Sequence, residues 1–348
     1  MHELPPFHPS RPELVAPVRL DRTGENGPTV GQARGKAWRK ISRGFYVPAG
    51  VAADDPNQRI LEASVLAPHD GAVTGWAALH WLGGAWFDGS RGVNGRRPVV
   101  VATAGRTVRE RSGIAISEER LDPRDVVCVD GLSVTTAVRS ACFEMRYAPS
   151  DRAAAVVLSM AAYSDLVSIA EMAAYAAAHS GWTGIPRCRW ALGHAVENAW
   201  SPPEVLMGLA WQLDAGHPRP LFNVPVFDRE GRHIGTPDLI DPEAGVTGEY
   251  AGELHLEGQQ RAVDLRREAD FRRVGLEPVT MVGSDLGDSS SFLHRLDDAY
   301  RRARHVPAAK REWTLELPHW WVPTHTVEQR RALDVEQRRL WLRHRRVV

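Results

Sequence analysis

The side chains best suited to chemistry are carboxylates that recur between positions 201 and 273. Glu204 follows Ser-Pro-Pro, and Asp238 follows Thr-Pro. Glu249 and His255 share the stretch Gly-Glu-Tyr-Ala-Gly-Glu-Leu-His. Mg²⁺ prefers hard oxygen ligands, keeps several waters, and can activate one of them while it neutralises charge on a phosphate. Asp238 and Glu249 are therefore candidate Mg²⁺ ligands at a phosphodiester. His255 is a candidate for orienting the water or for stabilising the developing negative charge.

The sequence around these residues predicts a helix, three strands, a helix, a strand and a last helix. Ser201 is expected to cap the first helix, because Pro202 follows at the first helical position and Glu204 stands where a capping-box acid would. Asp238 is placed near the end of the second strand and Glu249 on the third, so that the two carboxylates could share a cation. The predicted segments are a helix over 202–215, strands over 223–228, 232–240 and 245–250, a helix over 264–273 and a strand over 277–282.

A wider pattern carries a resemblance to a known family. Its pieces are Ser201-x-x-Glu204, Pro237-Asp238, Gly248-Glu249-Tyr250-x-Gly252-x-x-His255 and Asp264-x-x-Arg267-Glu268. The pattern resembles the endonuclease-like domain related to very short patch repair enzymes, a branch of the PD-(D/E)XK superfamily. In actinobacteria such a domain is often fused behind a region like that of the AbiEi antitoxins of type IV toxin-antitoxin systems, and much of this chain fits that two-part pattern.

The resemblance implies roles for particular residues. Asp238 and Glu249 would be metal ligands, and Glu204 would be an accessory acid. His255 would occupy the place where related proteins usually have lysine or histidine. The chain departs from the family at Ala251, because the common sequence Glu-Tyr/Phe-Asp-Gly has an aspartate there. A carboxylate expected near the metal is therefore missing, which lowers the negative charge available to hold a cation.

Each of these residues also has a purely structural explanation. Glu204 is equally well explained as the second half of a capping box, and Asp238 after a proline could be a turn former. Glu249 is harder to explain in this way, because an unpaired carboxylate on an otherwise apolar strand would be costly to bury. A histidine such as His255 usually lies at the surface or is satisfied by neighbours. Arg267 could face a nucleic-acid backbone, but the acids interleaved with it also suit a solvated, salt-bridged helix face.

Length and composition limit the remaining choices. The 348 residues suffice for two or three compact domains. Lys plus Arg and Asp plus Glu both number 43, so the formal net charge is zero and no global basic field indicates nucleic-acid binding. The three cysteines show no Cys-x-x-Cys spacing, which argues against structural zinc and against a disulfide framework and favours a reducing cytoplasm. No leader follows Met1 and no apolar run is long enough to span a bilayer, so neither secretion nor a membrane partner is expected.

The first half of the chain resembles the AbiEi-type region. Residues 1–35 are rich in proline, glycine and charge and are expected to be an irregular arm, whose glycines make a poor recognition helix. Residues 37–48 match the wing of that family, two strands around an Arg-Gly turn, within a mixed α/β region over 36–148. The wing residues Arg39, Lys40 and Arg43 could contact phosphate, although an ordinary hairpin with solvated charges explains them as well. The further predicted elements are helices over 56–67, 74–83 and 136–147 and strands over 97–102, 113–117 and 125–129, with Thr74 capping the second helix.

Two segments flank the endonuclease-like domain, which is expected over 198–304. Residues 149–197 are alanine-rich and predict a helical connector whose small side chains allow close packing. Residues 305–348 form the one clearly basic stretch, and tryptophans interleave with its charges. Those rings could stack on bases or cover phosphates. Alternatively, the first part of this tail lies across the body as a packed arm, and 326–345 forms an exposed helix.

Together these features predict an α+β chain with an N-terminal winged α/β region, a helical connector and a restriction-endonuclease-like α/β/α core. Three hypotheses for function remain open. The first is a Mg²⁺-dependent DNA endonuclease that acts in defence or in a toxin-antitoxin system. The second is a non-catalytic DNA-binding antitoxin or transcriptional regulator with a degenerate nuclease fold, and the third is a module that binds a cognate toxin protein.

Overall fold

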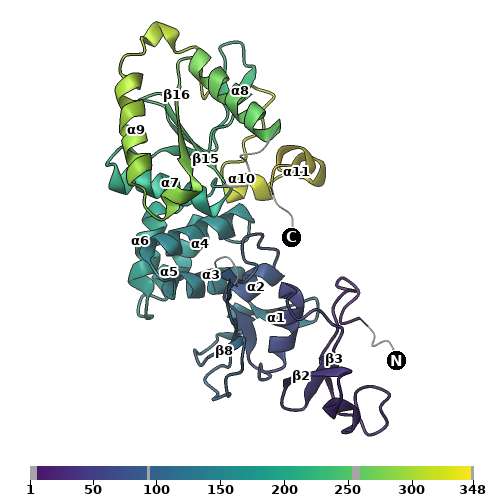
Figure 1. The fold of residues 1–348 in the computed structure, drawn as a ribbon. Coiled ribbons are helices and arrows are strands. Elements are labelled where there is room, and N and C mark those ends of the chain that lie inside the picture. The colour runs from purple at the N-terminus through teal and green to yellow at the C-terminus, as the bar shows by residue number, and fades with distance from the viewer. Residues whose placement is uncertain (1–5, 92–94, 253–258, 346–348) are drawn as a thin grey trace. The chain divides into compact units, whose positions relative to one another are not determined.

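The computed structural model describes residues 6–91, 95–252 and 259–345 of the chain (Figure 1). The chain forms two compact units, Met1–Tyr147 (unit 1) and Ala148–Arg346 (unit 2). Helices occur in both units and the strands belong to separate sheets, so the predicted α+β class is confirmed. None of the described helices is both long enough and apolar enough to cross a bilayer.

Unit 1 contains a five-stranded sheet in the order β8-β7-β4-β10-β9 and a three-stranded sheet in the order β1-β3-β2. The strands of the larger sheet are β4 (Ala72–Thr74), β7 (Val99–Ala102), β8 (Ile114–Ser117), β9 (Val126–Val129) and β10 (Leu132–Thr135). The smaller sheet consists of β1 (Val18–Arg19), β2 (Trp38–Ser42) and β3 (Phe45–Pro48), and the last two confirm the predicted hairpin. The helices are α1 (Pro56–Ser64), α2 (Trp76–Trp81) and α3 (Ala137–Arg146), and β5 (Ser90–Arg91) pairs with β6 (Gly95–Arg96).

The segment around residue 74 differs from its prediction. Thr74 was expected to cap a helix, but it is the last residue of β4, and the cap of α2 is Gly75 at φ +66°. A side chain at Gly75 would strike Glu144, whose carboxylate accepts the Trp76 N–H at 2.8 Å. A carboxylate distant in sequence, rather than the neighbouring hydroxyl, therefore satisfies this first N–H group of α2.

Unit 2 begins with the predicted helical connector, α4 (Asp151–Tyr163), α5 (Ile169–Ala178) and α6 (Ile185–His194). Ser150 caps α4, and Ser168 caps α5 in a full capping box with Glu171. Buried alanines such as Ala155 and Ala191 lie on facing helices. Their small side chains allow α4 and α6 to pack closely.

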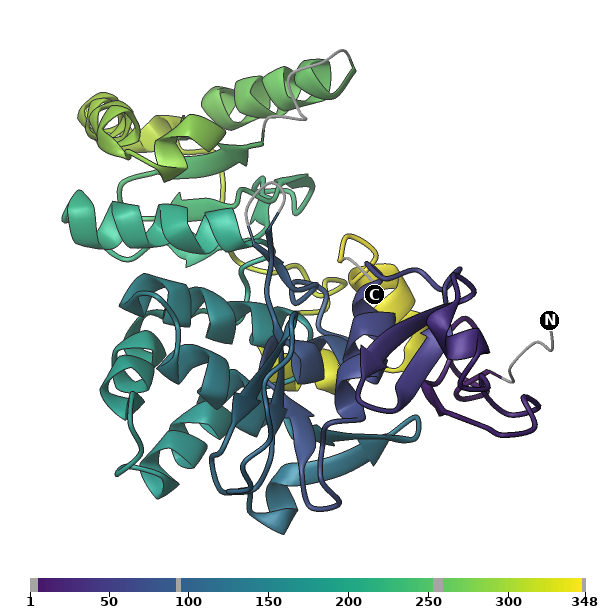
Figure 2. The same ribbon diagram turned by 60° about the horizontal axis from the view of Figure 1, so that its bottom comes forward.

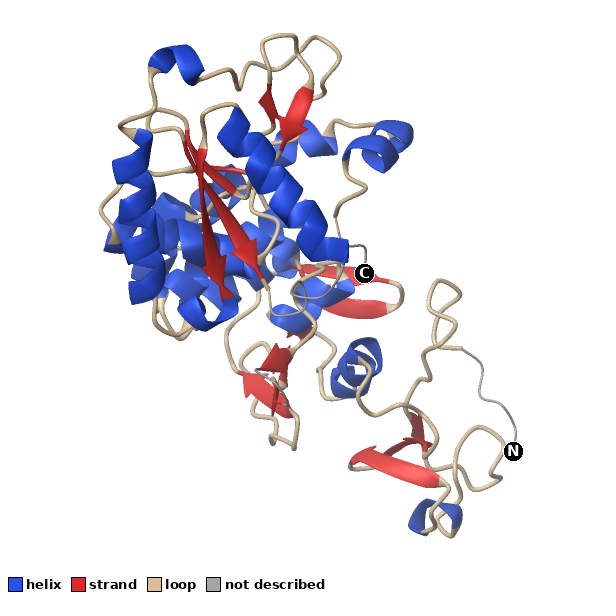
Figure 3. Ribbon diagram, turned by 45° about the horizontal axis from the view of Figure 1, so that its top comes forward, coloured by secondary structure: helices blue, strands red, loops and turns tan. Residues whose placement is uncertain are grey.

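The core of unit 2 is a four-stranded sheet in the order β11-β14-β15-β16. β15 pairs antiparallel with β14 and parallel with β16, and β15 and β16 run side by side in Figure 3. The order of helix, strands, helix, strand and helix is as predicted. The elements are α7 (Pro202–Leu209), a π-helical turn (Ala210–Asp214), β11 (Leu221–Phe222), β14 (Leu239–Asp241), β15 (Val246–Ala251), α8 (Gln259–Arg273), β16 (Glu277–Val282) and α9 (Ser290–Ala303).

Helices α7 and α8 lie on opposite faces of this sheet (Figure 2). A side chain at Gly248 would meet Trp211 and Met207, which belong to α7 and the turn after it. The next residue, Glu249, instead reaches Arg267 on α8. Successive residues of a strand face opposite sides, so the two helices cover the two faces.

Two of the predicted strands differ in the structure: the one over 223–228 is shortened to two residues, and the one over 232–240 is divided in two. The segments β12 (Val226–Phe227) and β13 (His233–Gly235) form a separate ribbon, whereas β11 and β14 join the main sheet. Asn223 has φ +49°, which ends the extended strand, and Pro237 has no N–H to donate to a ladder. The break leaves Asp238 immediately before β14.

The first part of the tail is a packed arm. Trp313 and Leu315 pack against a core cluster that includes the buried Val226. Between them, the Thr314 N–H donates to the Phe227 carbonyl at 2.8 Å. The arm therefore covers the core of unit 2 and adds a bridge to the β12–β13 ribbon.

The end of the tail forms two short helices, α10 (Val327–Arg331) and α11 (Val335–Trp341), so the prediction of one exposed helix was wrong. Arg330 is fully buried and pairs with Asp165 at 2.7 Å. It also donates to the Ala162 carbonyl near the end of α4, and Arg338 pairs with the same Asp165 at 2.7 Å. Cations suit this place because the last carbonyls of a helix lack intrahelical partners. These two arginines hold the tail on α4.

A buried hydrogen-bond chain joins α9 to the sheet. Tyr300 Oη donates to Asp241 Oδ2 at 2.6 Å and accepts from Trp211 Nε1 at 3.0 Å. Burial, followed by the hydrogen bond to Asp241, raises the pKa of Tyr300 well above its usual range, so the hydroxyl keeps its proton.

The substitution Tyr300→Phe is expected to lower the free energy of unfolding by about 1–3 kcal/mol, because Asp241 and Trp211 would each lose a buried partner. Urea or thermal unfolding of the full chain measures the change. Tyr46→Phe is the control, since Tyr46 is also buried but its hydroxyl has no hydrogen-bond partner among the described residues. Equal losses in the two variants would contradict the prediction.

Candidate active site and a basic groove

The pairing of β14 with β15 brings two of the predicted carboxylates to the same end of the sheet. Leu239 pairs with Gly248 in this antiparallel ladder, so Asp238 is placed across from Glu249. Asp238 Oδ2 accepts the Tyr250 N–H at 2.7 Å, which fixes its carboxylate against β15. The two predicted metal ligands therefore occupy neighbouring positions on adjacent chain segments.

Glu204 joins them from the first turn of α7. Its carboxylate accepts from the Trp200 N–H at 2.7 Å, from Asn223 Nδ2 at 2.7 Å and from Ser201 Oγ at 2.9 Å. The side chain is only 6% exposed. Burial, and then the negative charge of Asp238, raise the pKa of Glu204 to about 7. Ser201 is therefore the cap of α7, as predicted, but Glu204 accepts the backbone N–H of Trp200 rather than that of the cap residue, so the capping box is not formed. Glu204 also lies within the electrostatic reach of Asp238.

Arg267 of α8 closes the site on its other side. Its guanidinium forms an ion pair with Glu249 Oε2. The second oxygen, Oε1, is buried and has no hydrogen-bond partner among the described residues. Arg267 was predicted either to contact nucleic acid or to belong to a solvated, salt-bridged helix face. In the structure its side chain pairs with a candidate metal ligand on the neighbouring strand.

Two further residues of the predicted motif, His255 and Ala251, add no ligand to the site as the structure describes it. His255 lies outside the described residues. Ala251 follows Glu249 by two positions on β15 and therefore belongs to the same face of the strand. An aspartate at this position, which the resemblance led us to expect, would add a carboxylate on that face, and alanine adds none.

The site offers a small set of donors for a divalent cation. Asp238 and Glu249 supply carboxylate oxygens, and the buried Oε1 of Glu249 is an acceptor whose partner is missing from the described protein atoms. Within the described ranges, no cluster of three or more His, Cys, Asp or Glu side chains has the arrangement of a metal site. Two carboxylates fit Mg²⁺, because this ion is commonly held by one or two carboxylates and keeps several of its waters.

Sequence reasoning missed Asn223, which holds Glu204 in place. Its Nδ2 also donates to the Asn198 carbonyl at 2.8 Å, and Asn198 Nδ2 donates back to the Asn223 carbonyl at 3.1 Å. The positive φ of Asn223 is a conformation that asparagine tolerates better than most residues. An asparagine between two apolar segments gives no sequence signal for this role, because its partners lie 19 and 25 positions away.

Scanning the chain against protein-family models, curated proteins and solved structures found no match.

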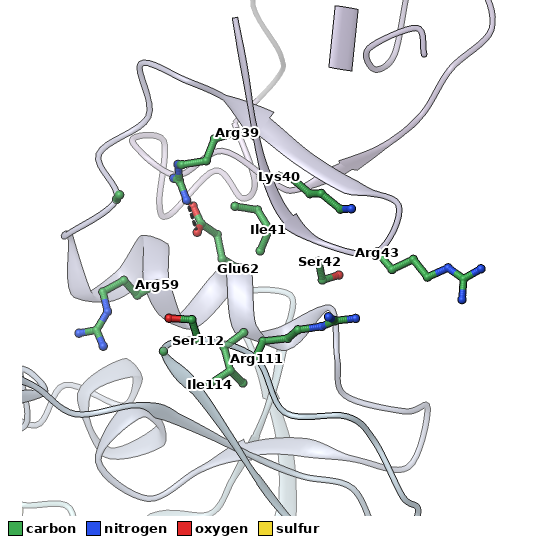
Figure 4. A pocket seen from close by; sticks show the side chains of 12 residues that line it. Arg39, Lys40, Ile41, Ser42, Arg43, Arg59, Glu62, Arg111, Ser112 and Ile114 are labelled. Atoms are coloured by element: carbon green, nitrogen blue, oxygen red, sulfur yellow. Dashed lines mark hydrogen bonds and ion pairs between the residues drawn. The ribbon is translucent and has the colours of Figure 1, made fainter. Parts of the chain in front are cut away.

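Unit 1 carries a basic groove of about 710 Å³ between the β2–β3 hairpin and the segment before β8 (Figure 4). Arg39 forms two hydrogen bonds of 2.8 and 2.7 Å to Glu62, so its charge is neutralised within the fold. Lys40, Arg43 and Arg111 line the same groove, and their side chains make no ion pair or hydrogen bond with other described residues. Figure 4 shows Arg43 and Arg111 extending in the same direction, away from Arg39.

The structure therefore changes the composition of the predicted phosphate-binding surface. Arg39 is committed to Glu62, whereas Lys40 and Arg43 remain available at the groove. Arg111 was missed, because it lies 68 positions along the chain from Arg43 and only the fold brings it there. Arg59 also lines the groove, but it donates to the Arg97 carbonyl at 2.5 Å.

The raised pKa of Glu204 makes unfolding depend on pH. In the unfolded chain this carboxyl takes its ordinary pKa of 4.5, and in the folded chain about 7. Between these values only the folded state binds the proton, so the contribution of Glu204 to stability is present at low pH and is lost as the pH rises through about 7. The loss is on the order of 3 kcal/mol between pH 4.5 and pH 8, since one pKa unit is about 1.4 kcal/mol.

Glu204→Gln mimics the protonated carboxyl and is expected to remove this pH dependence and to raise the unfolding temperature at pH 8. Calorimetric unfolding of both proteins at pH 5 and pH 8 measures it. Glu243→Gln, which changes an exposed acid between β14 and β15, is the control and should leave the pH dependence unchanged. A wild-type profile that the Glu204 variant reproduces would show that this carboxyl is ionised in the folded state at pH 5.

Proposed function

We propose that this chain is a divalent-cation-dependent endonuclease-like protein that acts on DNA, with Asp238, Glu249 and Glu204 at its reacting centre. Two observations carry the proposal: Asp238 lies across from Glu249 on the neighbouring strand, and Glu204 lies within the electrostatic reach of Asp238. These residues are separated by 34 and 11 positions in the sequence. Glu249 Oε1 is buried without a hydrogen-bond partner among the described residues, and such an oxygen is costly unless a cation or donor meets it. A phosphodiester is the substrate class for which such a site beside an arginine is suited.

Each residue has a chemical task in this proposal. Asp238 and Glu249 would hold Mg²⁺, which would polarise a phosphate oxygen and lower the pKa of a bound water. Glu204, with a pKa of about 7, can accept or release a proton at neutral pH, as a general acid or base must. The guanidinium of Arg267 lies at the Glu249 carboxylate and can pair with a phosphate group through two parallel hydrogen bonds. The cationic side chains of the groove in unit 1 would contact the DNA backbone.

Two observations favour a second candidate, a non-catalytic DNA-binding regulator. Arg267 already neutralises Glu249, and Ala251 adds no carboxylate to the same face of β15. In this alternative the Arg267–Glu249 pair is a permanent structural bond that replaces the cation. The basic groove of unit 1 would then provide the function.

The carboxylate site predicts metal-dependent nicking of DNA. The wild-type chain is expected to bind Mg²⁺ or Mn²⁺ and to nick supercoiled plasmid. Asp238→Asn and Glu249→Gln should each lower the nicking rate by at least about 100-fold, because each removes a ligand charge. Calorimetric titration of the metal and gel assays of plasmid and single-stranded DNA provide the measurements.

Glu243→Gln is the matched control for these assays, because it removes an exposed acid from the loop between the same two strands. Its binding and nicking should equal those of the wild type. A wild-type chain that binds DNA but neither binds metal nor nicks would overturn the nuclease proposal and support the regulator. Wild-type activity that survives both Asp238→Asn and Glu249→Gln would place the reacting centre elsewhere.

The groove of unit 1 predicts salt-dependent binding to DNA backbone. Replacing Arg43 and Arg111 with alanine together should lower duplex affinity equally for different sequences. It should also reduce the slope of log affinity against log salt by about 2, since each lost phosphate contact removes about 0.9. Fluorescence anisotropy at salt concentrations from about 50 to about 200 mM measures both the affinity and the slope. Arg120→Ala, an exposed arginine outside the groove, is the control, and an equal slope in both variants would exclude the groove as the binding surface.

A further inference from the structure

A second cavity, of about 770 Å³, opens beside the carboxylates of unit 2. Three of its lining residues also belong to the candidate site. The backbone N–H of Trp200 and the side-chain amide of Asn223 both donate to the Glu204 carboxylate, and Arg267 pairs with Glu249. Whatever occupies this cavity is therefore adjacent to the residues that would meet a phosphodiester. Its volume falls within the range of about 300–1,000 Å³ that is typical of ligand sites.

The tail supplies several aromatic side chains to the lining of the cavity. Trp321 lies edge-on to Trp320 and Trp341, with ring centroids 5.5 and 5.0 Å apart. On another side of the cavity, His344 stacks on Trp200 at 3.9 Å. Edge-to-face pairs leave ring faces uncovered by the partner, and Trp320 is 48% exposed although it is a large apolar side chain. These rings can accept a further planar group by stacking.

Two buried polar atoms of lining residues have no hydrogen-bond partner among the residues that the structure describes. Asn223 is 3% exposed, and its Oδ1 accepts no hydrogen bond from the described residues. The indole Nε1 of Trp200 is buried and likewise finds no acceptor among them. An unsatisfied buried group costs about 1–3 kcal/mol. One donor and one acceptor thus belong to residues that line the cavity, and the polar edge of a nucleobase carries both kinds of group, whereas an aliphatic occupant carries neither.

The charged side chains of the cavity suit the rest of a nucleotide. Arg267 and the exposed Arg343 both line it. A guanidinium pairs readily with a phosphate, and Arg267 lies between the cavity and Glu249. Stacking faces, hydrogen-bonding atoms and arginines thus occur together, as in proteins that bind unpaired nucleotides.

We propose that this cavity binds one unpaired DNA base, which places the phosphodiester next to it at Asp238 and Glu249. The proposal rests on the proposed function for its choice of DNA, and it adds that the preferred substrate has a base out of the double helix. The base comes from a single strand or from a nucleotide displaced from a duplex, because both present the same free ring face and edge.

The test compares strands with and without a base, in EDTA so that binding is measured apart from cleavage. Three fluorescent probes serve: a 12-nucleotide single strand, the same strand with abasic sugars at its central positions, and a duplex with one unpaired central base. Base-aromatic stacking predicts that the full wild-type chain binds the normal strand about 5- to 100-fold more tightly than the abasic strand. Trp320→Ala should abolish most of this preference while leaving the affinity for the abasic strand unchanged.

Trp200→Phe is a second variant, which keeps an aromatic ring beside His344 but removes the indole N–H together with the five-membered ring. It should fold as stably as the wild type, and it should lower the preference for the base by about 2- to 10-fold. Trp190→Ala is the matched control, because Trp190 also stacks on a histidine, His194, at 3.9 Å but does not line the cavity. The duplex with one unpaired base separates the two sources of the base. If the wild type binds this duplex more tightly than a fully paired one, and Trp320→Ala removes the difference, the base is a nucleotide displaced from a duplex. If the wild type binds the two duplexes equally, the base comes from a single strand.

Equal binding of normal and abasic strands by the wild type would overturn the inference, as would a base preference that survives both Trp320→Ala and Trp200→Phe. These failures are distinguishable from failure of the proposed function. Plasmid nicking that depends on Asp238 but not on Trp320 would leave the nuclease proposal standing without the base-binding cavity. A base preference without any nicking would leave the cavity standing without the nuclease.

Discussion

The candidate site depends on the register between β14 and β15. Pairing Leu239 with Gly248 places Asp238 across from Glu249, and a shift of one residue would turn Glu249 to the opposite face of the sheet. Gly248 helps to set this register, because Trp211 and Met207 fill the space that a side chain would need. The packing of α7 on one face thus determines which carboxylates meet at the other.

Charge is the second constraint on this region. Glu204 lies near Asp238, Asp238 lies across from Glu249, and Glu249 pairs with Arg267. The protein limits the repulsion among these carboxylates in two ways. Arg267 neutralises Glu249, and Glu204 takes up a proton near neutral pH because it is buried beside Asp238. Both arrangements can be reversed, the first by a cation or phosphate that competes for the ion pair and the second by a change in pH. A region balanced in this way suits proton transfer and ligand exchange better than it suits stability.

Positive charge is distributed unevenly although the chain is neutral as a whole. In the basic tail, Arg330 and Arg338 form ion pairs with Asp165, and Arg330 also donates to a carbonyl near the end of α4. These two positive charges therefore stabilise the fold. The β2–β3 hairpin is less basic in sequence, but its Lys40 and Arg43 line a groove together with Arg111. Counting charges along a sequence cannot separate these cases, because an arginine is committed or available according to neighbours that are distant in the chain. The tail's tryptophans, by contrast, serve both as packed core and as cavity wall.

The sequence by itself determined the α+β class, the order of the elements from α7 to α9, the β2–β3 hairpin and the capped alanine-rich helices. These features follow from periodicity, capping residues and turn residues, which act over a few positions. The choice of Asp238 and Glu249 rested on motif and spacing, and their roles as metal ligands stay a prediction, as do the DNA and toxin partners. Only the tertiary structure decided that Asn223 and Trp200 form hydrogen bonds to Glu204 and that Arg267 pairs with Glu249. It also decided that Glu62 neutralises Arg39 whereas Arg111 lines the groove. The contribution of the tail to a cavity was likewise visible only in the fold. These contacts join residues far apart in the sequence, and their energies depend on burial and on neighbouring charge, which a local pattern does not contain.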